Sequence, residues 1–141
     1  MVCIYCGGET KVTNSRLQRR NNQVWRRREC LVCQSVFTTH ESVELESALS
    51  VNKDGQTEPF LSDLLLKELM AALKHRKDVY TASREVLGTV VRKLLTLPQK
   101  PLFSPTDITK TTAGVLRRFD RQAYLRYLAD HPSIQPARIS G

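Results

Sequence analysis

The sequence predicts an α+β protein, with a small three-stranded antiparallel sheet at the N-terminus and a mostly helical domain that opens with a β-hairpin. Two observations lead to this division. All four cysteines lie within the first 33 residues, among short segments of strand type. Beyond them the chain has no cysteine, is richer in leucine and repeats apolar residues at helical spacing. We therefore expect domains at residues 1–42 and 43–131 and a flexible tail at 132–141.

The cysteines form two C-x-x-C pairs with 23 residues between them, Cys3 with Cys6 and Cys30 with Cys33. Two such pairs can offer four thiolates to one tetrahedral zinc ion, which is the arrangement of a zinc ribbon. Two disulfides are the alternative. Gly7 and Gly8 after the first pair fit a tight metal-binding turn better, and the cytosolic location that we expect keeps thiols reduced. The sequence therefore predicts a structural Zn2+ site.

Three short strands are expected around these cysteines, at residues 11–13, 24–28 and 36–38, with Asn21–Asn22 as a hairpin turn. A sheet of this size can bury only a few apolar side chains. The candidates are Val12, Leu17, Val24, Trp25, Leu31, Val36 and Phe37. Metal binding is therefore expected to supply much of the folding free energy of this domain.

Residues 1–40 carry +5 of the formal net charge of +8, a balance that favours polyanionic partners. The candidate DNA contacts are Lys11, Arg16, Arg26, Arg27 and Arg28. Alternation along a strand places Arg26 and Arg28 on one face and Arg27 on the other. Arginine can bind phosphate through two hydrogen bonds or read guanine edges, so the ribbon can serve as a DNA-binding module. A solubilising surface on a protein-interaction module is the alternative.

The second domain is expected to begin with a hairpin, because apolar and polar residues alternate from Val43 to Val51 and Asp54–Gly55 follows as a turn. Lys53 beside this turn could bind nucleotide phosphates, although many exposed turns carry a lysine. Residues 42–131 contain no nucleophile with a base, no P-loop and no paired carboxylates, so we do not expect an enzyme. The isolated histidines, His40, His75 and His131, are expected at the surface.

Four helices are expected after the hairpin. Ser62 is the N-cap candidate of the first helix, whose core stripe is Leu65, Leu69 and Leu73, with Leu66 and Met70 beside it. The second helix spans residues 81–95, with Val86, Val90, Val91, Leu94 and Leu95 as its apolar residues. Ser104 or Thr106 can cap the third helix, which continues through Val115 and Leu116, and the fourth lies within residues 119–130.

Membrane insertion is not expected, because no apolar stretch approaches the roughly 20 residues that a membrane helix needs. The N-terminus also lacks the basic start and apolar run of a signal peptide. We expect a cytoplasmic protein without a membrane partner.

The segments "TNSR", "RRRECLVC", "FTTHE" and "VNKDGQTEPF", in this order behind a C-x-x-C pair, resemble the NrdR family of bacterial repressors of ribonucleotide reductase genes. The resemblance extends to about Ala129. It implies a zinc ribbon that binds paired operator boxes in double-stranded DNA, joined to an ATP-cone domain that senses ATP and dATP. It also implies no catalysis and a location at the bacterial nucleoid. From these properties we expect homo-oligomers, dimers or larger, whose assembly depends on the nucleotide.

Individual residues match the family in both domains. The four cysteines match its zinc ligands, and Arg16 with Arg26–Arg28 match the basic positions expected to face DNA. In the cone, Val51, Lys53, Asp54 and Gly55 match a V-K-R-D-G turn, and Asp120, Ala123, Tyr124 and Arg126 fit a D-x-x-A-Y-x-R stretch. The resemblance assigns nucleotide binding to Val51, Asn52, Lys53, Lys67, Tyr124 and Arg126.

The cone departs from the family where phosphate charge must be neutralised. Lys53 replaces an arginine, Asn52 stands where lysine is usual, and Leu64 takes another common lysine position. Lys67 would then have to serve from one turn away, and Glu68 replaces a frequent glycine. Fewer cationic donors weaken phosphate binding. A zinc-ribbon accessory module that binds nucleic acid or protein and carries a degenerate, non-sensing cone is therefore the alternative.

Overall fold

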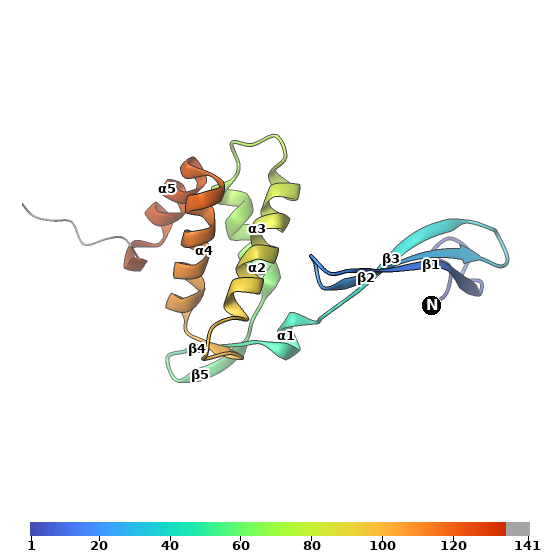
Figure 1. The fold of residues 1–141 in the computed structure, drawn as a ribbon, viewed down its shortest axis with the longest axis horizontal. Coiled ribbons are helices and arrows are strands. Elements are labelled where there is room, and N and C mark those ends of the chain that lie inside the picture. The colour runs from blue at the N-terminus through green and yellow to red at the C-terminus, as the bar shows by residue number, and fades with distance from the viewer. Residues whose placement is uncertain (135–141) are drawn as a thin grey trace, which may run out of the picture. The chain divides into compact units, whose positions relative to one another are not determined.

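The structure, a computed structural model, describes residues 1–134 and divides into two compact units, Met1–Glu44 and the residues from Leu45 onward. The first unit is an antiparallel sheet of three strands in the order β1 (Thr10–Gln18), β2 (Gln23–Cys30) and β3 (Val36–Ser42) (Figure 1). The α+β class is confirmed. The strands are longer than predicted, because β2 pairs along its whole length, from the Cys30–Thr10 end to the Gln23–Gln18 end.

The interior of this first unit differs from the prediction. Phe37 alone of the predicted apolar core is buried, in a cluster with Cys3 and Cys30. The other predicted members are exposed (Val12, Leu17, Leu31 and Val36) or half-buried (Val24 and Trp25). A single sheet has no second layer within its own unit to cover either face. The cysteine cluster therefore takes the place that an apolar core has in a larger domain.

The second unit opens with a short helix, α1 (Leu45–Ala48), where the sequence pattern predicted a strand. The N–H of Leu49 donates to the carbonyl of Leu45 at 2.8 Å, which closes one helical turn. Leu45 and Leu49 both pack against the core of this unit. The strand prediction was wrong because the spacing of these two leucines, four residues apart, suits a helix as well as alternation suits a strand.

The predicted hairpin is present and joins β4 (Ser50–Lys53) to β5 (Gln56–Pro59). Its turn residues both have positive φ, 52° at Asp54 and 81° at Gly55, as a type I′ turn requires. A two-residue strand, β6 (Leu102–Phe103), pairs in parallel with β4 and completes a second small sheet. The sequence did not predict β6, which is too short to show an alternating pattern.

The predicted helices are α2 (Ser62–Ala72), α3 (Val79–Leu94), α4 (Pro105–Phe119) and α5 (Arg121–Asp130) (Figure 1). Ser104 caps α4 in a reciprocal capping box with Asp107, as predicted. The prediction for Ser62 was wrong. Leu61 occupies the cap position of α2 without a side-chain hydrogen bond, because the chain arrives extended from Phe60, whose N–H donates to the carbonyl of Leu49.

One core unites these helices with the small sheet. The predicted stripes on α2 and α3 are buried, although Met70 and Leu95 at their margins are exposed. A short 3-10 helix, η1 (Pro132–Ile134), follows α5, and Ile134 packs against the core, so the predicted flexible tail does not begin at Pro132. The rest of that predicted tail, residues 135–141, lies outside the described residues. Within residues 1–134, none of the helices has the length and apolar character to span a bilayer.

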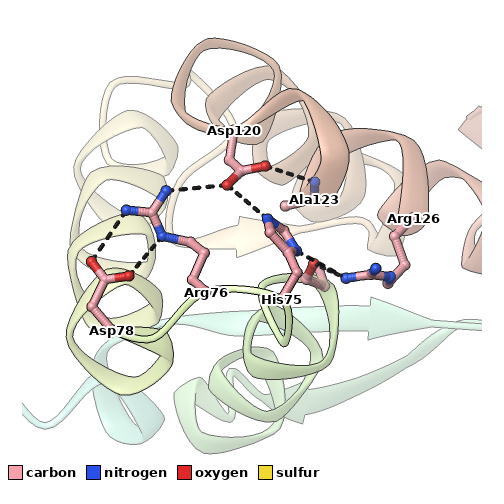
Figure 2. Close-up of polar contacts among 7 residues, drawn as sticks. His75, Arg76, Asp78, Asp120, Ala123 and Arg126 are labelled. Atoms are coloured by element: carbon pink, nitrogen blue, oxygen red, sulfur yellow. Dashed lines mark hydrogen bonds and ion pairs between the residues drawn. The ribbon is translucent and has the colours of Figure 1, made fainter.

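A polar network joins the loop after α2 to the junction of α4 and α5, as Figure 2 shows. The carboxylate of Asp120 accepts hydrogen bonds from Arg76 at 3.1 Å, from the His75 ring at 3.0 Å and from the N–H of Ala123 at 3.0 Å. The last of these makes Asp120 the N-cap of α5. Burial tends to raise the pKa of Asp120, but these three donors more than offset it and lower the pKa to about 2.

Arg126 extends this network from α5 to the end of α2. It donates to the carbonyl of Ala72 at 2.8 Å and lies 3.1 Å from Nδ1 of His75. Because arginine can only donate, Nδ1 accepts, and the proton on Nε2 is donated to Asp120. His75 was predicted to be an isolated surface residue. The residue is exposed, as predicted, but it is not isolated, because its side chain, which is 22% exposed, contacts both Asp120 and Arg126. His131 is likewise engaged, stacked on Tyr127 with ring centroids 4.0 Å apart.

Replacing Asp120 by alanine should destabilise the helical unit by about 2 kcal/mol, because the change removes a helix cap and two charge-assisted hydrogen bonds. The matched control is Asp78→Ala, whose partner is also Arg76 but whose side chain is 52% exposed; it should lower stability much less than Asp120→Ala does. Urea denaturation checks both. Since the folded pKa of Asp120 is lowered from 3.8 to about 2, the Asp120 effect should be complete above pH 4 and shrink as the pH falls towards 2.

Candidate metal centre and basic surface

The four predicted cysteines meet at one end of the ribbon, with their sulfur atoms all within 4.8 Å of one another. The Sγ atoms of Cys3 and Cys33 are 3.7 Å apart, and those of Cys6 and Cys30 are 3.5 Å apart. Four thiolates about 2.3 Å from a tetrahedral zinc ion are separated by about 3.8 Å. The donor set and its spacing therefore fit one structural Zn2+ ion.

The two cysteine pairs fold into equivalent turns. In the first, Gly7 N–H donates to Cys3 O at 2.9 Å, and in the second, Gln34 N–H donates to Cys30 O at 3.1 Å. Gly7 and Gln34, which directly follow each pair, both have positive φ, 75° and 65°. Backbone N–H groups also point at the sulfurs, for example Val32 N–H to Cys30 Sγ at 3.3 Å. Each turn therefore presents two sulfurs inward.

These hydrogen bonds prepare several thiols to bind a cation. Ser35, through its side chain first and its backbone second, lowers the pKa of Cys33 to about 6. The backbone N–H of Cys33 lowers the pKa of Cys30. At Cys6 the N–H of Gly8 lowers the pKa, but the adjoining thiols of Cys30 and Cys33 raise it to about 11. A bound zinc ion favours the thiolate form at all four positions.

Gly8 lets the two turns approach each other. A Cβ atom at this position would lie 2.7 Å from Cγ2 of Val32 and 3.2 Å from the sulfur of Cys6. Val32 belongs to the second turn, between Cys30 and Cys33. Glycine is therefore needed at position 8 because a larger residue would contact the second turn. Glycine is favoured at position 7 for a different reason, the positive φ of the backbone there.

One face of the sheet carries most of the exposed positive charge; we call it the Trp25 face. Its members are Lys11, Asn14, Arg16, Trp25, Arg27, Glu29, Val36, Thr38 and His40. Arg16 is exposed, and its guanidinium lies 5.8 Å from the centroid of the Trp25 ring. Arg27 is exposed and donates only to the neutral hydroxyl of Thr38 at 2.9 Å. Lys11 lies 3.9 Å from Glu29 in an exposed ion pair. Arg16 and Arg27 therefore keep their full charge available.

The opposite face holds the other two predicted arginines in contacts within the ribbon. Arg26 is 33% exposed and forms an ion pair with Glu41 at 2.8 Å. Arg28 is half-buried, its Nη1 lies 3.4 Å from Thr10 Oγ1, and its buried Nε has no hydrogen-bond partner among the described residues. Arg28 is paired across the sheet with Phe37, beside the cysteine cluster. Sequence reasoning missed Thr38 and Glu41, because the pattern does not show the strand register that pairs Thr38 with Arg27 and places Glu41, two residues beyond the partner of Arg26, within reach of that arginine.

The helical unit contains a separate open pocket of about 180 Å3 between the hairpin, α2 and the start of α4. Its walls are mainly apolar, and its lining residues are Val51, Lys53, Glu58, Pro59, Phe60, Leu61, Leu64, Leu65, Glu68, Pro105, Ile108 and Thr109. Lys53 is the only cation among them, and its Nζ lies 3.4 Å from a carboxylate oxygen of Glu58. Glu68 also lines the pocket, so the lining carries one positive and two negative groups.

Only part of the predicted nucleotide-binding set reaches this pocket. Val51 and Lys53 line it, whereas Asn52, Lys67, Tyr124 and Arg126, all within the described residues, do not. Leu64 and Glu68, one turn apart on α2, line the pocket, and Lys67 lies outside it. Arg126 is bound to Ala72 at the last residue of α2, and Tyr124 packs half-buried against the core.

Comparison with known proteins gives consistent matches. Residues 1–41 match the family described as transcriptional repressor NrdR-like, N-terminal domain. Three relatives named transcriptional repressor NrdR align with 90% of this chain. They are from Symbiobacterium thermophilum (35% identical, 84% of the relative covered), Desulforapulum autotrophicum (37%, 77%) and Desulfosudis oleivorans (34%, 84%). These relatives are named as repressors and not as enzymes, in agreement with the prediction from the sequence.

Replacing Gly8 by alanine should weaken zinc binding about tenfold or more, because the added methyl group overlaps Val32 and overpacking typically costs about 1–3 kcal/mol. Competition with a chromophoric chelator measures the affinity. Val32 is 68% exposed, so Val32→Ala alone should change it little. The double variant should recover most of the loss. If zinc affinity stays low in the double variant, contact with Cγ2 of Val32 is not the reason for glycine at position 8, and the contacts with Cβ of residue 32 at 3.0 Å and with Sγ of Cys6 at 3.2 Å are.

Proposed function

Because the chain belongs to the NrdR family of transcriptional repressors, we propose that its zinc ribbon binds double-stranded DNA at operator boxes upstream of ribonucleotide reductase genes. The observation that carries this proposal is the Trp25 face, where Arg16 and Arg27 are exposed on adjacent strands of a sheet that the cysteine turns hold in shape. Zn2+ has a structural role here, and it fixes the turns from which β2 emerges.

Arg27 and Arg16 are the principal DNA contacts in this proposal, with Lys11 as a phosphate contact. Their guanidinium groups can bind a phosphate or the O6 and N7 edge of guanine through two hydrogen bonds. Arg26 and Arg28 support the sheet instead, through Glu41 and the Thr10–Phe37 region. Of the three consecutive arginines, Arg27 therefore faces the DNA, while Arg26 and Arg28 make contacts within the ribbon.

A single ribbon makes few base contacts, so one copy binds weakly and with strong dependence on salt. Two or more copies held at the spacing of paired operator boxes bind far more strongly, because the second contact becomes intramolecular. Homo-oligomerisation is therefore part of the proposal. We assign its control to ATP and dATP bound at the hairpin pocket, where Lys53 supplies the phosphate contact. Linkage then requires that DNA change nucleotide affinity by the same factor as nucleotide changes DNA affinity.

A second candidate function is favoured by the charge of that pocket. Glu58 pairs with the single lysine, Glu68 adds a second carboxylate to the lining, and Leu64 adds an apolar wall. Bringing a triphosphate to such a lining adds like-charge repulsion where neutralisation is needed. The alternative is a DNA-binding repressor whose assembly does not respond to nucleotide, with the helical unit serving as a scaffold.

Arg27→Ala should weaken binding to a duplex from the upstream region of a reductase gene by about tenfold or more, because a bidentate arginine contact is worth about 1–3 kcal/mol. Arg26→Ala is the matched control on the same strand, and it should have a smaller effect because Glu41 already holds this side chain. Fluorescence anisotropy with zinc-loaded protein measures both affinities. A larger loss for Arg26→Ala would place the DNA on the opposite face, and a wild type without operator preference would contradict the proposal.

Light scattering of zinc-loaded protein with no nucleotide, with ATP and with dATP distinguishes the two candidates. A nucleotide-dependent change of mass, abolished by Lys53→Ala, supports the sensing cone. An unchanged mass supports the non-sensing repressor. In that case Leu64→Lys combined with Glu68→Gly should raise dATP affinity about tenfold or more, measured by calorimetry, because it adds one cation and removes one carboxylate at the pocket. No gain would show that pocket charge is not what limits binding.

A further inference from the structure

The positive charge of the helical unit is concentrated in two short segments. Residues 45–134 contain fourteen Lys and Arg against ten Asp and Glu. Six of those cationic residues and two of the carboxylates lie in segments 74–78 and 117–121, whereas the remaining residues balance at eight against eight. The six are Lys74, Arg76, Lys77, Arg117, Arg118 and Arg121. The whole charge excess of residues 45–134 therefore belongs to these two segments.

The two segments adjoin in space, and the network in Figure 2 holds them together. Arg76 from the first segment lies 3.1 Å from the carboxylate of Asp120 in the second. The same guanidinium stacks over the ring of Phe119, with its central carbon 5.1 Å from the ring centroid. Asp120 is also the C-terminal cap of α4 and the N-terminal cap of α5, so the backbone of the second segment is fixed at this contact. We call the five remaining cations, Lys74, Lys77, Arg117, Arg118 and Arg121, the basic end.

The basic end is exposed, and its charges are not neutralised nearby. All five side chains belong to exposed residues, and none of them forms an ion pair within residues 1–134. Both carboxylates of these segments, Asp78 and Asp120, are bound to Arg76, which leaves five exposed cations around them. Like charges held close together repel one another, and a polyanion relieves that repulsion.

Helix dipoles explain only some of these positions. Arg117 and Arg118 lie in the last turn of α4, where cations are favourable. Arg121, however, is the first residue of α5, and Lys77 directly precedes the N-terminal cap of α3. Cations are unfavourable at both of these helix starts. Helix stability therefore does not explain why cations occupy the positions of Arg121 and Lys77, whereas binding of an anionic partner does.

We propose that the basic end is a second DNA-binding surface, which contacts the sugar-phosphate backbone without reading sequence. This inference rests on the proposed function in one respect, that the protein binds duplex DNA. Five cations, two on the connection between α2 and α3 and three at the junction of α4 and α5, suit a duplex better than a single phosphorylated ligand, because a duplex carries one charge per about 1.7 Å of axis. A small phosphorylated ligand would need a cavity with cations in its walls. Lys53 lines the hairpin pocket in this way, whereas none of the five cations of the basic end lines that pocket.

The test compares two charge-matched variants of the full-length, zinc-loaded protein. The first removes three cations of the basic end, Lys77→Gln, Arg118→Gln and Arg121→Gln. The control removes three exposed lysines elsewhere on the helical unit, Lys93→Gln, Lys100→Gln and Lys110→Gln. DNA affinity is measured by anisotropy over a series of salt concentrations, with an operator duplex and with a scrambled duplex of equal length. Zinc content and urea denaturation check that both variants fold.

The basic-end variant should lose about 1 to 3 units from the slope of log affinity against log salt, because each phosphate contact contributes about 0.9. At a fixed moderate salt its affinity should fall about tenfold, equally for operator and scrambled duplex. The control should keep the wild-type slope. An unchanged slope in the basic-end variant, or an equal loss in the control, overturns the proposal. Loss of ATP binding with an unchanged DNA slope overturns it too, since the surface would then hold a nucleotide.

The two proposals fail in different ways in this experiment. If wild type binds both duplexes equally and the basic-end variant lowers both affinities, operator recognition fails and the present inference stands. If wild type prefers the operator and the basic-end variant behaves like wild type, the inference alone fails. If wild type binds neither duplex even at about 50 mM salt, both are wrong, because backbone contacts are strongest at low salt.

Discussion

The contact on which the N-terminal unit depends is the meeting of four cysteine sulfurs within 4.8 Å of one another. The sheet buries only Phe37 beside these cysteines, so its apolar side chains contribute little to its stability. A structural zinc ion supplies folding free energy directly in domains of this kind. Cys30 is also the last residue of β2, so the metal centre fixes the strand that carries all three consecutive arginines. The position of these arginines therefore depends on the geometry of the metal centre more than on core packing.

Strand alternation then gives the three arginines different tasks. Arg27 faces Thr38 and leaves its charge free, while Arg26 meets Glu41 and Arg28 reaches towards Thr10. A surface ion pair such as Arg26–Glu41 adds little to stability, but it does reduce the charge that this face offers to a phosphate. The helical unit likewise has charged residues that hold the structure together and others whose charge is free. An apolar core fixes the helices, Arg76 and Asp120 tie their connecting segments together, and the surplus cations stand outside these contacts.

The sequence was sufficient for features that depend on local spacing. The two C-x-x-C pairs, the type I′ turn at Asp54–Gly55, the cap at Ser104 and the leucine stripe of α2 were all predicted, because each is set by residues close together in the chain. Features set by contacts between distant residues were missed. The network of His75 with Asp120 joins residues 45 positions apart, and β6 acquires its identity only by pairing with β4. The predicted ribbon core failed for a related reason, since alternation identifies apolar positions but not whether anything covers them.

The two proposed DNA surfaces differ in what they contribute to repression. Contacts to the phosphate backbone raise affinity for operator and non-operator DNA alike, so they leave the ratio between the two unchanged. Selectivity must then come from the Trp25 face, where only Arg16 and Arg27 are free to read base edges. With so few base contacts per copy, discrimination grows mainly by requiring several ribbons to bind correctly spaced boxes together. In the proposed scheme, a pocket lined by one lysine and two glutamates binds a triphosphate weakly and so limits nucleotide control of that assembly. If the helical unit makes strong contacts with the DNA backbone, a single copy already binds DNA, and oligomerisation is needed less for affinity. Oligomerisation is then needed more for specificity, because the backbone contacts do not distinguish operator from other DNA.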